Sequence, residues 1–238
     1  MPSRLASLLA LLLPLCCAAA APGTGLEPGL RPPYASAVLI EAHSGAVLYS
    51  YLPHLVRSPA STQKILLELV VMEQVATGRL RLEDSVHVSA HASRVGGSQV
   101  YLKEGEVLTV DDLLYALIVQ SANDAAVALS LHVAGTKEAF VEMMNEKARE
   151  LGMTNTEFHS VHGLPPGRGQ QPDVTTARDM TRLCRELLKR VLPGGAVGVV
   201  DLGPAGDAGP GLVAVVVEGD RLAELFHESG LLRAGSHQ

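Results

Sequence analysis

Stretches rich in β-branched residues stand near both ends of this chain, and a long helical region separates them. Near the start, "SAVLIEA" at 36–42 and "AVLYSY" at 46–51 flank Gly45, a pattern typical of a β-hairpin. Near the end, "GLVAVVVEG" at 211–219 predicts a further strand. A hairpin and a late strand can form one antiparallel sheet, with helices covering its faces and a helical part beside it. The sequence therefore predicts an α+β fold.

A mainly helical part is expected between these strands, over about 61–190, with a short strand candidate, "VHVS", near 86–89. The helix after Pro59 is expected to end at Gly78. Two later helices start at capping pairs, Thr109 with Asp112 and Thr176 with Asp179. Two amphipathic segments between them are "NDAAVALSLHVA" and "KEAFVEMMNEKAREL", and a short helix, "DRLAELFHES", follows the last strand.

Composition excludes several functional classes. The 238 residues suffice for one domain with a sizeable core. A net charge of −6 without a long Lys/Arg run argues against nucleic-acid binding. Aromatic residues make up only 3% and tryptophan is absent, so a stacking platform for bases or sugars is not expected.

The first residues have the pattern of a cleavable export signal. Arg4 supplies the positive charge, "LASLLALLLPLCC" the apolar run, and four alanines at 18–21 the small residues. Cleavage after Ala20 predicts a signal peptide at 1–20, a Pro/Gly-rich lead-in at 21–34 and one domain at 35–238. The alternatives are a membrane anchor, for which the run is short, and a lipoprotein signal at Cys16 or Cys17. Export would leave Cys184 alone, as a buried core residue.

Ser61 and Lys64 interrupt the entry to the apolar helix after Pro59. Residues three apart share one helix face, so the hydroxyl and the amine lie one turn apart. A serine hydroxyl needs a base within hydrogen-bond reach, and a lysine serves once burial lowers its pKa. The motif alone is weak, since a chain of this length contains roughly one such pair by chance. The alternative is a capping serine beside a lysine whose charged end reaches solvent.

A second polar pair, Ser121 and Asn123, stands in "VQSANDAA" at the junction of two predicted helices. A hydroxyl here is able to relay a proton to a leaving group, and an amide to hold a substrate amide. The alternative is a polar linker in which Ser121 caps a helix.

Three segments together resemble the serine D-alanyl-D-alanine carboxypeptidases, the low-molecular-mass penicillin-binding proteins. They are "SPASTQK", "GGSQVYLKEGEVLTVDDLLYALIVQSANDAA" and "HGLPPGRGQQPDVTTARDM", and the similarity covers about 35–190. The resemblance implies a β-lactamase/transpeptidase-like fold. It also implies that Ser61 forms an acyl-enzyme, that Lys64 accepts the proton, and that Ser121 and Asn123 complete the site. His162, in the "HGL" stretch, is interpreted as loop structure.

The implied reaction removes the terminal D-alanine from the peptidoglycan stem pentapeptide, in the periplasm or cell envelope of a bacterium. β-Lactam antibiotics are the inhibitors that this resemblance implies, and no cofactor is needed. Peripheral association with the membrane or wall stays open.

The third motif of this family, Lys-Thr-Gly or Lys-Ser-Gly, is absent from the sequence. One alignment of "GVVDLGPAGDAGPGLVAVVV" with the family's strand pair puts Asp201, Leu202 and Gly203 in its place. Asp201 would repel the substrate carboxylate, Leu202 has no hydroxyl, and Pro204 has no N–H for an oxyanion. The alternative is a merely shortened connection, and either way the sheet is expected to be shortened in its C-terminal part.

Three other functions stay open. Because the third motif is missing, the first alternative is a catalytically impaired homologue that binds peptidoglycan or a partner. Ser-x-x-Lys and Ser-x-Asn are shared with class A β-lactamases, although "SAN" replaces their usual "SDN". A metal site would need more than two histidine pairs, His159 with His162 and His87 with His91, which we interpret as solvated.

Overall fold

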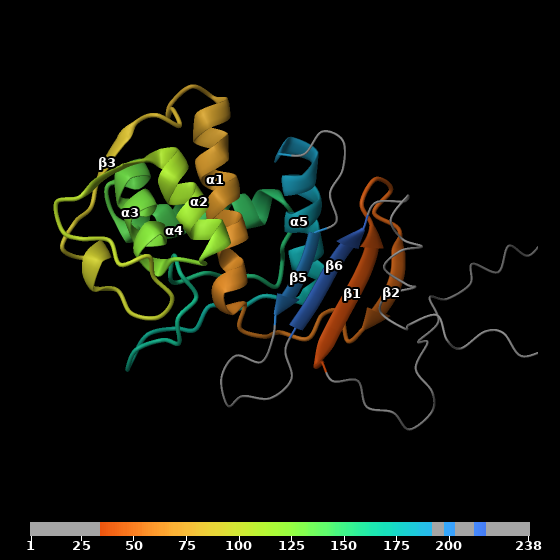
Figure 1. Cartoon of the computed structure of the whole chain (residues 1–238). Coiled ribbons are helices and arrows are strands. Elements are labelled where there is room, and N and C mark those ends of the chain that lie inside the picture. Colours follow the sequence, from red (N-terminus) through yellow and green to blue (C-terminus); the bar gives the residue numbers. More distant parts are fainter. Residues whose placement is uncertain (1–33, 192–197, 203–211, 218–238) are drawn as a thin grey trace, which may run out of the picture.

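The computed structural model describes residues 34–191, 198–202 and 212–217 (Figure 1). In chain order its elements are β1 (Ser36–Glu41), β2 (Val47–Tyr51), η1 (Ala60–Gln63), α1 (Lys64–Ala76), β3 (Ser85–His87), η2 (Ala92–Arg94), β4 (Val107–Thr109), α2 (Val110–Val119), α3 (Asn123–Ala134), α4 (Lys137–Glu150), α5 (Ala177–Val191), β5 (Gly198–Leu202) and β6 (Leu212–Val217). The predicted signal peptide, nearly all of the lead-in and the helix expected after the last strand lie outside the described residues.

The main sheet has the strand order β2-β1-β6-β5. β1 and β2 form the predicted hairpin, in which Gly45 adopts a φ of +73° that suits glycine. β5 and β6 are also antiparallel, from the pair Gly198 and Val216 to the pair Leu202 and Leu212. The predicted α+β class is confirmed, since this sheet lies beside a helical part (Figure 1).

The prediction of an antiparallel sheet is wrong for the central pair. β1 and β6 run parallel, from Ser36 beside Leu212 to Glu41 beside Val217. β6 enters the sheet beside β1 in the same direction, and no strand lies between the two among the described residues. Parallel neighbours require a long crossover, which the helical middle of the chain provides.

Helix α5 joins the sheet to the rest of the molecule. It packs against β1 and β6 on one side and against α1 on the other (Figure 1). Arg185 of α5 donates hydrogen bonds to the backbone carbonyls of Ala42 and His43, at 2.8 and 2.6 Å. A Cβ on Gly45 would lie 2.7 Å from the Arg185 guanidinium, so a larger residue here would displace that side chain, while the positive φ of the turn itself favours glycine.

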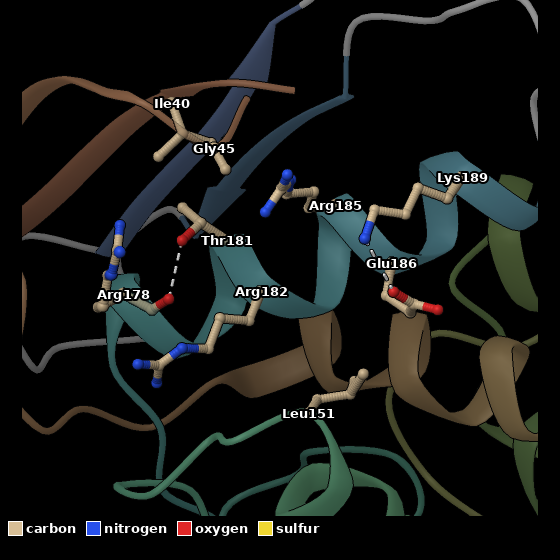
Figure 2. A pocket seen from close by; sticks show the side chains of 9 residues that line it. All are labelled: Ile40, Gly45, Leu151, Arg178, Thr181, Arg182, Arg185, Glu186 and Lys189. Atoms are coloured by element: carbon tan, nitrogen blue, oxygen red, sulfur yellow. Dashed lines mark hydrogen bonds and ion pairs between the residues drawn. The ribbon is translucent and has the colours of Figure 1, made fainter. Parts of the chain in front are cut away.

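The same face of α5 lines a polar pocket with the β1–β2 turn (Figure 2). Its cations are largely engaged, because Arg185 holds the turn, Arg182 pairs with buried Asp179, and Lys189 pairs with Glu186 at 3.4 Å. The pocket therefore belongs to the packing of α5 on the sheet. It contains none of the residues that the sequence analysis singled out as catalytic.

Helix α1 is the centre of the helical part and contacts α2, α3, α4 and α5. Its apolar run is buried, as the fully covered side chains of Leu66, Leu67 and Leu69 show. Cys184 is buried as predicted, and burial raises the pKa of its thiol to about 12, which leaves it unreactive. None of the helices in the described ranges has the length and apolar character needed to cross a membrane.

Candidate active site

The nucleophile candidate, Ser61, lies in the 3₁₀ turn η1, directly before α1 begins at Lys64. The sequence predicted one continuous helix here, and the tighter turn leaves Ser61 exposed while the next turn is buried. Neither cap in this segment uses a side-chain hydrogen bond. Lys64 is only 2% exposed, so its amine does not reach solvent. Both observations argue against the capping serine and solvent-reaching lysine.

The Lys64 amine is surrounded by three oxygen atoms from separate parts of the chain. Its Nζ lies 3.0 Å from Ser61 Oγ, 3.3 Å from Ser121 Oγ and 3.1 Å from the backbone carbonyl of His162. Burial lowers the pKa of Lys64 from its ordinary value to about 8. An amine with this pKa is partly neutral near pH 7 to 8 and is able to accept a proton.

Ser121 reaches this amine through an unusual backbone conformation. It stands between α2 and α3 with a φ of +55°, which is uncommon for any residue other than glycine. The flanking chain is fixed, because Ser98 Oγ donates to the Gln120 carbonyl at 2.7 Å and Ala122 N–H to the Ala116 carbonyl at 3.3 Å. Strain of this kind is typical of functional sites, where the surrounding structure maintains it.

Asn123 begins α3 and is 2% exposed. Its side-chain Nδ2 donates to the Gly96 carbonyl at 2.8 Å, and its backbone N–H donates to the Ser98 carbonyl at 2.8 Å. The remaining polar atom, Oδ1, is buried without a partner among the described residues. Because this oxygen has no partner in the described part of the chain, Asn123 is suited to accept a hydrogen bond from an N–H donor.

The loop around His162 supplies a backbone group that the sequence analysis missed. His162 was interpreted as loop structure, and its carbonyl is one of the three partners of Lys64. A Cβ on Gly163 would lie 1.9 Å from the Ala60 carbonyl oxygen, so the loop packs directly on the turn that carries Ser61. A carbonyl acceptor has no residue-specific signature, and the glycine after His162 was the only sequence signal for this approach.

The two histidines of one pair, His159 and His162, have different hydrogen-bond and charge partners. His162 Nδ1 accepts a hydrogen bond from the Leu164 N–H at 3.2 Å, and burial together with nearby Lys64 lowers its pKa to about 4. His159 Nε2 lies 3.7 Å from Glu157 Oε1. In the part of the chain that the structure describes, no group of three or more His, Cys, Asp or Glu is placed to hold a metal ion.

Comparison with known proteins decides which family this site belongs to. The family model described as D-alanyl-D-alanine carboxypeptidase matches residues 33–196, which include Ser61, Lys64, Ser121 and Asn123. The chain belongs to the D-alanyl-D-alanine carboxypeptidase family.

Individual carboxypeptidases and their structures agree with this assignment. D-alanyl-D-alanine carboxypeptidase DacF of Bacillus subtilis is 41% identical over 154 residues, which are 65% of this chain and 39% of that protein. The structure of the carboxypeptidase DacD from Francisella tularensis matches with a TM-score of 0.64 at 31% identity, covering 71% of this chain and 38% of that one. The structure of penicillin-binding protein 5 from Haemophilus influenzae matches with a TM-score of 0.63 at 32% identity, covering 70% of this chain and 48% of that one. This chain therefore spans well under two thirds of each of these three proteins.

The carboxypeptidase family match ends just before the segment in which the third motif is expected. Strand β5, which contains Asp201 and Leu202, is an edge strand of the main sheet and lies next to η1, the turn of Ser61. Asp201 pairs with Val213 and Leu202 with Leu212 in the β5–β6 ladder. Gly203 and Pro204 lie outside the described residues. The assignment of Asp201, Leu202 and Gly203 to the third-motif position thus stays a prediction.

Proposed function

We propose that this chain is a serine-type D-Ala-D-Ala carboxypeptidase that forms an acyl-enzyme at Ser61 with peptidoglycan stem peptides, and that the absence of the Lys-Thr-Gly motif slows its turnover. The observation that supports it best is the placement of the buried Lys64 amine against the hydroxyls of Ser61 and Ser121. β-Lactam antibiotics are the expected inhibitors, because they acylate the same kind of serine. Family membership favours this function over the β-lactamase alternative.

The three oxygen atoms around Lys64 suggest how the proton moves. The His162 carbonyl can only accept, so it holds one N–H of the amine, whereas each hydroxyl can donate or accept. A neutral Lys64 therefore donates to His162 and Ser121 and offers its lone pair to the Ser61 hydroxyl. After taking that proton, the ammonium donates to all three oxygen atoms.

Proton transfer to Lys64 lets Ser61 Oγ attack the carbonyl carbon of the penultimate D-alanine. The new O–C bond forms, the C–N bond to the terminal D-alanine breaks, and Ser121 passes the proton from Lys64 to the leaving amine. Water then hydrolyses the acyl-enzyme by the same route in reverse. Asn123 Oδ1, the acceptor without a partner among the described residues, is assigned to a substrate N–H.

The rate of labelling by a fluorescent penicillin should rise with pH, because only neutral Lys64 accepts the proton. With a pKa of about 8 for Lys64, the rate is expected to increase about tenfold per pH unit below that value and to level off above it. Labelling time courses of the full chain between pH 5.5 and 9.5, quantified by gel fluorescence, measure this profile. A rate that is flat across this range would contradict Lys64 as the proton acceptor.

We also propose that the chain is exported to the periplasm or cell envelope after removal of residues 1–20. The support is the Arg4-led apolar run and the alanines that follow it. N-terminal sequencing of protein recovered from the envelope of an expressing bacterium should give a start near Ala21. Recovery of the intact Met1 form in the cytoplasmic fraction alone would refute the proposal.

A further inference from the structure

Gln63 stands between Ser61 and Lys64 in the sequence, and the proposed mechanism gives it no role. Its side chain is fully buried. The side-chain Nε2 donates to the Ser160 carbonyl at 2.7 Å and to Ser160 Oγ at 3.1 Å. Gln63 therefore ties the turn of the nucleophile to a loop almost a hundred residues away.

Ser160 is itself held from the other side. Its Oγ donates to Asp173 Oδ2 at 2.6 Å and accepts from the Gly163 N–H at 3.0 Å. The other carboxylate oxygen of Asp173 accepts from the backbone N–H groups of His159 and Ser160, at 2.6 and 2.9 Å. Hydrogen bonds to a carboxylate are among the stronger ones in proteins, so Ser160 presents a fixed acceptor to Gln63.

These contacts bracket the residue whose carbonyl touches Lys64. On one side of His162, Ser160 is bound to Gln63. On the other side, Gly163 lies against the Ala60 backbone, with no room for a Cβ. The His162 carbonyl, 3.1 Å from Lys64 Nζ, lies between these two attachments.

A purely space-filling role does not account for an amide at this position. Gln63 Oε1 is buried and has no partner among the described residues, which costs stability relative to an apolar side chain of similar size. Methionine or leucine would fill the same space without that cost. The feature that they lack is the Nε2 donor to Ser160.

We propose that Gln63, together with Ser160 and Asp173, is a positioning unit that holds the His162 carbonyl against Lys64 and keeps water from the amine. This inference rests on the proposed function for its kinetic consequence. Its structural consequence, a low pKa of Lys64, is measurable without any catalysis.

The test substitutes Gln63→Met, which keeps size and removes both donors. The matched control is Gln74→Met, the same change at a half-buried position near the other end of α1. One readout is the rate of fluorescent-penicillin labelling against pH. The other is the titration of the Lys64 side chain by NMR, with the resonance assigned from Lys64→Arg. His162 is the titratable group beside Lys64, with Asp173, Lys137 and His91 around it, so its imidazole is followed in the same spectra.

In Gln63→Met the loosened loop admits water, which favours the charged amine, so the Lys64 titration should move up by about one pH unit or more. Because each unit leaves about tenfold less neutral amine below the pKa, labelling at pH 7 should slow by about tenfold or more. Gln74→Met should match the parent in both readouts. An unchanged Lys64 titration in a folded Gln63→Met protein would overturn the inference, even if its melting temperature falls.

Ser160→Ala is the second variant, in case Gln63→Met does not fold. It removes the hydroxyl that links Gln63, Gly163 and Asp173 and leaves the Ser160 carbonyl in place. It should shift the Lys64 titration in the same direction, and the double variant should shift it by less than the two single shifts combined. Additive shifts would show that the residues act separately and would overturn the unit. If the parent does not label but the titration moves as expected, the proposed function fails and the positioning unit stands.

Discussion

Lys64→Ala and Ser61→Ala are each expected to abolish covalent labelling of this chain by penicillin. The nucleophile and its base act as one unit, since a hydroxyl without a base and a base without a hydroxyl fail alike. Losses for such units are on the order of 10⁴-fold or more, and the double variant should be no slower than either single one. Labelling with fluorescent penicillin, followed by mass determination of the adduct, measures the effect.

Lys103→Ala is the matched control, because Lys103 is an exposed lysine on the loop before β4. It should label at the parent rate. If Lys64→Ala also labels at the parent rate, another group accepts the proton from Ser61. Loss of labelling in Lys64→Ala with retained labelling in Ser61→Ala would instead place the acylated residue elsewhere.

The second large effect concerns turnover, and we expect release of D-alanine from a pentapeptide to be weak or undetectable. In this family a cation and a hydroxyl bind the terminal carboxylate of the substrate, and the predicted alignment puts Asp201 and Leu202 in their positions. Loss of a charge-assisted contact costs about 1.5–3 kcal/mol, and loss of an oxyanion donor about 2.7–4 kcal/mol. Even the lower values together correspond to about a thousandfold slower reaction.

The measurement is D-alanine release by the full chain, beside the triple variant Asp201→Lys, Leu202→Thr and Pro204→Ala. If β5 occupies the third-motif position, the triple variant should be faster than the parent, while both form the acyl-enzyme at Ser61. Robust release by the unaltered chain would refute the impairment. It would mean that another cation, such as Arg168 or Arg190, binds the carboxylate. Labelling without release by the parent would favour the impaired homologue that binds peptidoglycan.

Local patterns were sufficient to predict much of this fold. The β1–β2 hairpin follows from Gly45 between two β-rich runs, and the start of α2 from Thr109 and Asp112, which form a full capping box. These signals act over a few residues. The parallel pairing of β1 with β6 was missed, because strand direction depends on which distant strand becomes the neighbour.

In the candidate site, too, local sequence signals were sufficient for some residues, whereas contacts that form only on folding were missed. Reactive side chains at fixed spacing predicted Ser61, Lys64, Ser121 and Asn123. The structure places the hydroxyls of Ser61 and Ser121 beside the Lys64 amine. The His162 carbonyl was missed because every residue carries such a group. Gln63 was missed because its partner, Ser160, is close only after folding.

The parallel pairing of β1 with β6 also affects how the chain reaches its native state. β1 is made early during synthesis, and its neighbour on that side, β6, is made only after the whole helical middle. Contacts between segments so distant in sequence form slowly, because a long loop must close first. Until then, one side of β1 carries unpaired backbone groups, a surface to which other strands can add. Growing chains should therefore depend on chaperones or rapid export until β6 emerges, and chains truncated before Leu212 should aggregate through β1.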